Sequence, residues 1–292
     1  MTRDALLTVV FAVTATVMYA LSNVLQTAEA EQLSDDDTLS VGILAKLARR
    51  PRWLVGMGAD VGGYLFEALA LGIGTLVVVE PILSTALLVS LFLGSVLHHR
   101  TIDRNDWIAA LILASGVAIF LYQVEPTGGR DFAPREAWAV AIPLVLAMEL
   151  VCITMARGSV GPRRAAFLGT GAGVAFGVSA VLTKAFVTYL SHGVFAWVPH
   201  WEPYGLAVAS IGGLVLSQSA FQTGALAAAV GAEQVWQPFT GVALGVWLLD
   251  EQLRTPGPVA NLLVVMSLAM MAIGVVTLAN RTEGGTEPNP LP

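Results

Sequence analysis

Nine apolar stretches of roughly 20 residues follow one another along this chain of 292 residues, and they constrain its fold more than any other feature. A helix needs about 20 apolar residues to cross the ~30 Å hydrocarbon core of a bilayer. The predicted spans are 4–28, 53–73, 75–97, 106–123, 136–156, 163–188, 203–224, 226–249 and 257–279. Backbone groups in lipid must pair within their own segment, so spans of this kind form helices. The sequence therefore predicts an all-α polytopic membrane protein.

The composition agrees with this prediction and excludes several other classes. Hydrophobic residues make up 55% of the chain and charged residues 12%, which is typical of a multi-pass protein of the cell membrane. The expected surroundings are the lipid bilayer, and no basic tract indicates nucleic acid. The single cysteine, Cys152, excludes a disulfide framework and a cysteine-ligated metal cluster. No phosphate-binding, zinc-helix or hydrolase motif is present, so we expect no cofactor and no enzymatic activity, and the oligomeric state stays open.

Lys and Arg residues are unevenly distributed between the two sides of the membrane. Ten of them lie in the odd-numbered connections or after the last span, and four lie in the even-numbered connections or before the first span. Connections on the cytoplasmic side carry the excess of positive charge. The N-terminus is therefore predicted outside the cell and the C-terminus in the cytoplasm.

The chain repeats itself at an offset of 157 residues. Residues 15–28 match residues 172–185 at six of 14 positions, and residues 64–92 match residues 221–249 at ten of 29 positions. Helices 1–4 are therefore predicted to be related to helices 6–9, with helix 5 as a connector. Because an odd number of spans separates equivalent positions, the second repeat crosses the membrane in the opposite direction. Inverted repeats are typical of transporters that alternate between outward-open and inward-open states.

The repeat divides the chain into four parts. These are the first repeat (1–123), the connector helix (124–160), the second repeat (161–279) and a disordered C-terminal tail (280–292). Within the first repeat, residues 38–50 follow three aspartates and end in basic residues, a pattern that favours a short helix. Thirteen residues rise only about 20 Å, so this segment is predicted to lie on the cytoplasmic surface, and a re-entrant path stays open.

Several segments resemble the drug/metabolite transporter superfamily. They are the run Gly177-Val178-Ser179-Ala180-Val181-Leu182-Thr183-Lys184, the mid-helix residues Pro81 and Pro238, and the acidic helix end Leu248-Leu249-Asp250-Glu251-Gln252-Leu253. The resemblance covers residues 4–279, and the helix number is most similar to the nine-helix branch that includes magnesium transporters. It implies a secondary transporter built from two inverted four-helix repeats.

Carboxylates inside the spans are the first candidates for a binding site, because charge at membrane depth is costly and marks function by default. Glu67 and Glu80 lie on either side of a turn predicted near residues 72–74, and Asp60 lies two turns before Glu67 on the same helix face. Two facing carboxylates repel each other unless a proton or a cation lies between them. This arrangement predicts proton coupling or binding of a divalent cation. The alternative is that each carboxyl group forms a separate structural hydrogen bond.

The two prolines add candidates from the second repeat. A proline in a membrane helix frees a backbone carbonyl, and kinks at equivalent positions of inverted repeats indicate the binding site. The full set of predicted substrate- or ion-binding residues is Asp60, Tyr64, Glu67, Glu80, Gln218, Gln222, Trp236 and Gln237, with Pro81 and Pro238 as helix kinks. Glu67 and Glu80 would also be the ligands of a divalent cation, and a metal site is otherwise unassigned. For the glutamines and aromatic residues, packing between helices is an equal alternative.

Three other features have local interpretations. Gly169, Gly173 and Gly177 recur at every fourth position and predict a face for close helix packing. Lys184 is expected to extend along its helix to the outer interface. Glu149 lies near the middle of the connector helix, and its partner cannot be derived from the sequence.

These observations predict an integral membrane secondary transporter or facilitator of a small metabolite, amine or cation, working by alternating access between two inverted repeats. The first alternative is a divalent-cation transporter for Mg²⁺ that uses Glu67 and Glu80. The second is a membrane scaffold or accessory subunit that transports nothing. A pocket lined from both repeats favours transport, whereas carboxylates already paired with protein groups favour the scaffold.

Overall fold

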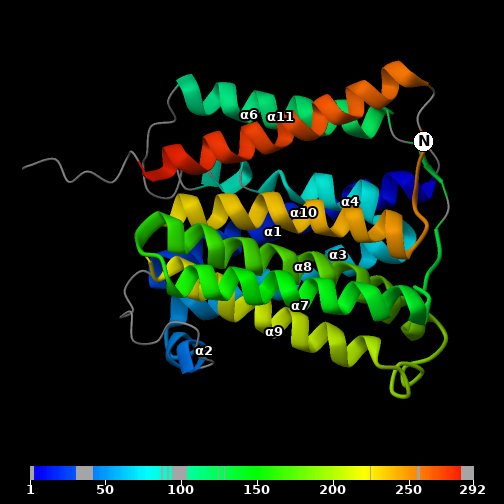
Figure 1. The fold of residues 1–292 in the computed structure, drawn as a ribbon, viewed down its shortest axis with the longest axis horizontal. Helices are drawn as coiled ribbons and strands as arrows, with labels where there is room; N and C mark the ends of the chain where they lie inside the picture. The colour runs from blue at the N-terminus through cyan, green and yellow to red at the C-terminus, as the bar shows by residue number, and fades with distance from the viewer. Residues whose placement is uncertain are drawn as a thin grey trace, which may run out of the picture.

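The chain folds into a bundle of long helices that run side by side (Figure 1). The computed structural model describes residues 3–30, 42–86, 88–90, 92–93, 104–123, 125–127, 129–223, 225–254 and 257–283. The helices are α1 (Arg3–Ala30), α2 (Gly42–Leu47), α3 (Pro51–Ile73), α4 (Leu76–Leu83), α6 (Arg104–Gln123), α7 (Arg135–Arg157), α8 (Gly161–Ser191), α9 (Glu202–Phe221), α10 (Leu226–Leu248) and α11 (Pro258–Glu283). Two short strands, β1 (Glu125–Thr127) and β2 (Gln252–Arg254), pair antiparallel. The predicted helical class is confirmed.

Within the described residues, five helices are long and apolar enough to cross a membrane, namely α1, α3, α7, α8 and α9. Shorter apolar helices cover Leu76–Ser90, Trp107–Phe120 and Pro258–Gly274. Large apolar side chains also face outward, such as Leu146, which is 62% exposed, and Val208, which is 73% exposed. An apolar exterior of this extent is stable in lipid and costly in water. The structure therefore indicates a membrane-embedded protein, and the arrangement of nine spans stays a prediction.

Helix α8 lies at the centre of the bundle and packs against α7, α9 and α10. Its glycines allow the close contact with α10, because a Cβ atom on Gly173 would lie 2.6 Å from the backbone oxygen of Glu233. A Cβ atom on Gly169 would lie 2.2 Å from the backbone oxygen of Ala229. The predicted close-packing face of Gly169, Gly173 and Gly177 is confirmed.

A tight turn joins α3 to α4, as the glycines near residue 73 predict. The Gly74 amide donates a hydrogen bond to the Ala70 carbonyl, which ends α3, and α4 begins two residues later. A Cβ atom at Gly74 would lie 2.3 Å from Cγ2 of Thr8 on α1, so only glycine allows this approach. Pro81 lies inside α4 and Pro238 lies inside α10, and these two helices pack against each other.

The remaining helices lie around this centre. Figure 1 shows α6 and α11 together along one edge of the bundle, where they pack against each other. Helix α2 covers residues 42–47 of the predicted surface helix and packs Leu47 against Trp53, whereas residues 31–41 lie outside the described part of the chain. Helix α11 continues to Glu283, four residues beyond the predicted end of the last span, and residues 284–292 of the predicted tail are not described.

Candidate functional site: an acidic cavity between the helices

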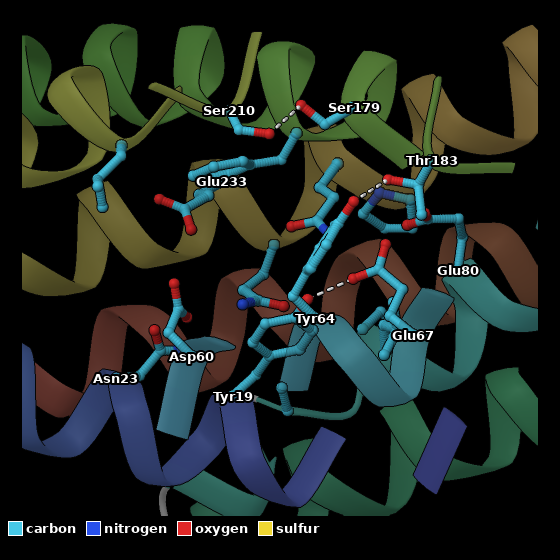
Figure 2. Close-up of a pocket in the computed structure, with 18 of the residues that line it drawn as sticks. Tyr19, Asn23, Asp60, Tyr64, Glu67, Glu80, Ser179, Thr183, Ser210 and Glu233 are labelled. Atoms are coloured by element: carbon cyan, nitrogen blue, oxygen red, sulfur yellow. Dashed lines mark hydrogen bonds between the residues drawn. The ribbon is translucent and has the colours of Figure 1, made fainter. Parts of the chain in front are cut away.

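A cavity of about 380 Å³ lies between α1, α3, α4, α8, α9 and α10 (Figure 2). Four carboxyl side chains line it, from Asp60, Glu67, Glu80 and Glu233. No Lys, Arg or His side chain is present among the described residues that line it. The cavity is therefore acidic, and it favours a positively charged occupant.

Helix α3 contributes three functional groups from one face. Asp60, Tyr64 and Glu67 are spaced by four and three residues, which places them one above another on an α-helix. All three are predicted binding residues, and all three line the cavity. The Tyr64 hydroxyl lies 3.1 Å from Oγ1 of Thr183 on α8, so this face also connects the first part of the chain to the second.

Two of these carboxylates accept hydrogen bonds from α1. The Tyr19 hydroxyl donates to Oε2 of Glu67, and the Ser22 hydroxyl donates to Oδ1 of Asp60 at 3.2 Å. The Tyr19 ring lies directly against α3, because a Cβ atom at Gly63 would lie 2.8 Å from the ring. The alternative of separate structural hydrogen bonds therefore holds in part for Asp60 and Glu67.

Glu80 differs from them. Glu80 is 0% exposed, and neither of its carboxyl oxygens has a hydrogen-bond partner among the described residues. The side chain lies against α10, where a Cβ atom at Gly241 would be 2.7 Å from Cγ of Glu80. Glycine at this position therefore provides the space that the carboxyl group occupies. Glu80 and Glu67 line the same cavity from the two helices that flank the turn.

Helix α10 contributes a second polar face. Gln237, a predicted binding residue, and Pro238, a predicted helix kink, line the cavity, and Glu233 and Gln234 line it one turn earlier. Glu233 is 8% exposed, and its Oε2 atom has no hydrogen-bond partner within the described residues. Glu233 lies near the start of its predicted span and was not among the predicted binding residues. Its spacing of four residues from Gln237 was the available signal.

Three predicted site residues lie outside the lining of this cavity. Gln218 instead connects α9 to α1, because its Nε2 atom donates to Oε1 of Gln26 at 2.8 Å. Trp236 packs edge-on against Phe239 with ring centroids 5.5 Å apart. Gln222 is buried at the end of α9. Pro81 is buried in α4 next to Glu80, and of the two prolines only Pro238 contributes to the described lining.

The sequence interpretation also missed lining residues on α1, α8 and α9. They are Tyr19, Asn23, Phe176, Ser179, Thr183 and Ser210. Tyr19 and Phe176 are separated by 157 residues, the offset of the repeat, so the alignment of 15–28 with 172–185 contained a signal for them. Ser179 had the same signal, since the offset pairs it with Ser22, whereas Ser210 had none.

The predicted extension of Lys184 to the membrane interface is wrong. Its Nζ atom lies 2.7 Å from Oε1 of Glu251, and the two side chains are 7% and 1% exposed. Glu251 also accepts hydrogen bonds from the backbone amides of Leu76 and Val77 at 3.2 Å and 3.1 Å. A carboxylate at this position satisfies free amides at the start of α4 and interacts favourably with the helix dipole. Lys184 is therefore held within the protein.

Glu149 on α7 is also buried in part, away from the cavity. A Cβ atom at Gly171 of α8 would lie 2.9 Å from its Oε2 atom, and Leu216 of α9 borders the same point. Neither carboxyl oxygen has a hydrogen-bond partner in the described part of the chain. Glu149 is therefore a buried carboxyl group outside the cavity, and its substitution can serve as a control for substitutions of the cavity carboxyl groups.

The described residues contain no group of three or more His, Cys, Asp or Glu side chains placed to hold a metal ion. Within the described part of the chain, a divalent cation would therefore find at most two such ligands at one point. Waters and amide oxygens would have to supply the other ligands of the ion.

Comparison with known proteins leaves the family open. The chain is 27% identical over 278 residues to an uncharacterised protein of Corynebacterium glutamicum, an alignment that covers 95% of each chain. No protein-family model matches the chain. No solved structure matches it.

Proposed function

We propose that this protein is a secondary transporter or facilitator in the cell membrane that carries a small positively charged solute, an amine or another cation. The observation that carries the proposal is Glu80, a fully buried carboxyl group without a hydrogen-bond partner among the described residues, in the wall of an acidic cavity. A buried carboxylate is costly unless a cation or a proton neutralises it. Such a carboxyl group suits the reversible binding of a cationic solute or of a coupling ion.

The inverted-repeat mechanism is part of the same proposal. Tyr19 and Phe176, which the 157-residue offset aligns, both line the cavity. Each ring lies against a glycine of the next helix, because Cβ atoms at Gly63 and Gly213 would both lie 2.8 Å from these rings. Helix α1 packs on α3 and α4, while α8 packs on α9 and α10. Gly63 and Gly213 are 150 residues apart and are not paired by the 157-residue offset, so the position of Tyr19 and Phe176 in one cavity is what supports two related units.

The resemblance to the drug/metabolite transporter superfamily agrees with this proposal. In such an arrangement, α1, α3, α4 and α6 form the first repeat, α7 is the connector, and α8, α9, α10 and α11 form the second repeat. Exchange of conformations between the repeats would open the cavity to one side and then to the other. The N-terminus lies outside the cell in this proposal, as the distribution of Lys and Arg indicates.

The two alternatives have less support. A Mg²⁺ carrier would use Glu67 and Glu80, yet Glu67 already accepts a hydrogen bond from Tyr19. Dedicated Mg²⁺ sites usually keep several waters on the ion, which a 380 Å³ cavity could accommodate, so Mg²⁺ belongs in the test. A scaffold would have no use for a cavity bounded by an unpaired carboxyl group, since filling it with apolar residues would be more stable.

The test is uptake into liposomes by the purified protein and by Glu80→Gln. Glutamine keeps the size of glutamate and removes its ionisable group, so the protein should still fold. We expect the wild type to accumulate a labelled amine in response to a pH gradient or to release protons on uptake. The Glu80→Gln variant should lose this response by at least about tenfold, because the carboxylate's charge-assisted contact with the cation is lost.

Glu149→Gln is the matched control, since Glu149 is a buried carboxyl group outside the cavity lining. Its uptake should equal that of the wild type. Mg²⁺ is offered in parallel, and uptake of Mg²⁺ without any amine would favour the divalent-cation alternative. Equal gradient responses in wild type and Glu80→Gln, at equal protein incorporation, would remove Glu80 from the mechanism.

A further inference from the structure

The four carboxyl groups of the cavity lie at two levels. Asp60 and Glu67 are seven residues apart on one face of α3, which separates them by about 10 Å along the helix. On α10, Glu233 precedes Gly241 by eight residues, about 12 Å along that helix, and Glu80 lies against Gly241. The spacing along α3 and the spacing along α10 therefore give nearly the same distance between the two levels. Asp60 and Glu233 belong to one level, and Glu67 and Glu80 belong to the other.

Figure 2 shows this division directly. Asp60 and Glu233 lie toward one end of the cavity, and Glu67 and Glu80 lie toward the other. The Tyr64 side chain lies between the two ends.

Each end contains one carboxyl group with free acceptor capacity. At one end, neither oxygen of Glu80 has a hydrogen-bond partner among the described residues, and at the other, Oε2 of Glu233 has none there. Both residues are more than nine-tenths buried. Besides the carboxyl groups, the lining contains apolar side chains such as Phe176 and Leu214 and polar ones such as Ser179 and Gln237. Buried acceptors of this kind are costly unless a donor reaches them, and here two donors are needed at two separate points.

We propose that the cavity binds an elongated molecule with a positively charged amine at each end and an aliphatic chain between them, a linear diamine or polyamine. One ammonium group lies between Glu67 and Glu80, and the other lies between Asp60 and Glu233. The chain between them packs against Tyr64 and Phe176. An ammonium group offers three donors, enough for both carboxylates of one end. This inference rests on the proposed function and adds the substrate class to it.

The test is calorimetric binding to the purified protein in lipid nanodiscs. The probes are a homologous series of linear diamines, the monoamines of matching chain length, and Mg²⁺ alone. Affinity should pass through a maximum at the diamine whose nitrogens reach both carboxylate pairs. The monoamine of that length should bind at least about tenfold more weakly, because it leaves one end without a donor.

Variants at the two ends provide a second measurement. Glu233→Gln and Glu80→Gln should each reduce the advantage of the best diamine over its monoamine by about tenfold or more. Glu149→Gln should keep the full advantage. If one end variant does not fold, the dependence on chain length in the wild type still decides the question.

The outcomes separate this inference from the proposed function. Affinity that does not depend on diamine length, or monoamines that bind as tightly as diamines, would overturn the two-ended site while leaving amine transport in place. An absence of binding and of uptake for every amine would overturn both. If Mg²⁺ binds and no diamine or monoamine binds, the two-ended site is contradicted and the divalent-cation alternative is favoured.

Discussion

At the scale of single residues, the ion pair between Lys184 and Glu251 joins three segments that are distant in the sequence. Lys184 belongs to α8, Glu251 follows α10, and the amides of Leu76 and Val77 begin α4. Burial makes each charge dependent on its partner, because an unpaired charge in this position has lost its hydration. Stability at this point therefore depends on both residues together.

We expect Lys184→Met to lower the free energy of unfolding by about 3–5 kcal/mol, the usual cost of leaving a buried charge unpaired. The double variant Lys184→Met/Glu251→Gln should recover part of this loss, since the glutamine keeps an oxygen for the α4 amides and carries no charge. Unfolding of the purified variants in detergent micelles measures both effects.

The neighbouring exposed ion pair is the control. Arg130 and Asp250 lie 2.7 Å apart, with side chains that are 58% and 55% exposed. Arg130→Met should change the free energy of unfolding by less than about 1 kcal/mol.

If the double variant Lys184→Met/Glu251→Gln is as unstable as Lys184→Met, the unpaired Glu251 carboxylate is not the source of the lost stability.

At the scale of elements, the contact between α8 and α10 holds one wall of the cavity. It depends on glycines, because helices in a membrane associate through close packing and not through exclusion of water. A Cβ atom at Gly173 would meet the Gln237 amide at 2.9 Å and the Glu233 carbonyl at 2.6 Å. Backbone atoms cannot move aside as the end of a flexible side chain can.

Gly173→Ala should therefore destabilise the protein by about 1–3 kcal/mol, the usual cost of overpacking. It should also weaken substrate binding, because Glu233 and Gln237 would shift with α10. Thermal unfolding and amine binding are the measurements. Gly212→Ala on α9 is the control, since a Cβ atom there meets nothing within 4 Å, and it should leave both quantities unchanged or raise stability slightly. Equal effects of the two variants would contradict a packing role for Gly173.

At the scale of the whole molecule, the proposed orientation predicts which connections face each side of the membrane. The segment between α7 and α8 lies beside Arg157, Arg163 and Arg164 and is expected in the cytoplasm. The segment between α8 and α9 is expected outside. Because the chain contains one cysteine, Cys152, single cysteines introduced into a Cys152→Ser background can report these positions.

Val160 and Val194 suit this measurement, since they are 84% and 72% exposed on either side of α8. A membrane-impermeant thiol reagent added to intact cells should label Val194→Cys at once. It should label Val160→Cys only after the membrane is opened. Labelling of both from outside would show that α8 does not cross the membrane, and the reverse pattern would invert the orientation while keeping the fold.

Local features of this protein follow from the sequence, because they depend on residues close together along the chain. Helix type follows from long apolar runs, and the turn between α3 and α4 follows from the glycines around Ile73. The grouping of Asp60, Tyr64 and Glu67 follows from helical periodicity alone. The glycine face of α8 likewise needs only the spacing of four residues.

Contacts between distant segments were decided by the tertiary structure. Lys184 could not be paired from the sequence, since its partner is 67 residues away and follows a different helix. For the same reason, the predicted binding residue Gln218 lies outside the cavity lining, whereas Glu233, which was not in the predicted set, lines the cavity. Their spans predict that both are buried and leave open which neighbouring helix each one faces. That choice depends on how α9 and α10 rotate against α1 and α8, and rotation is set by side-chain packing over the whole interface.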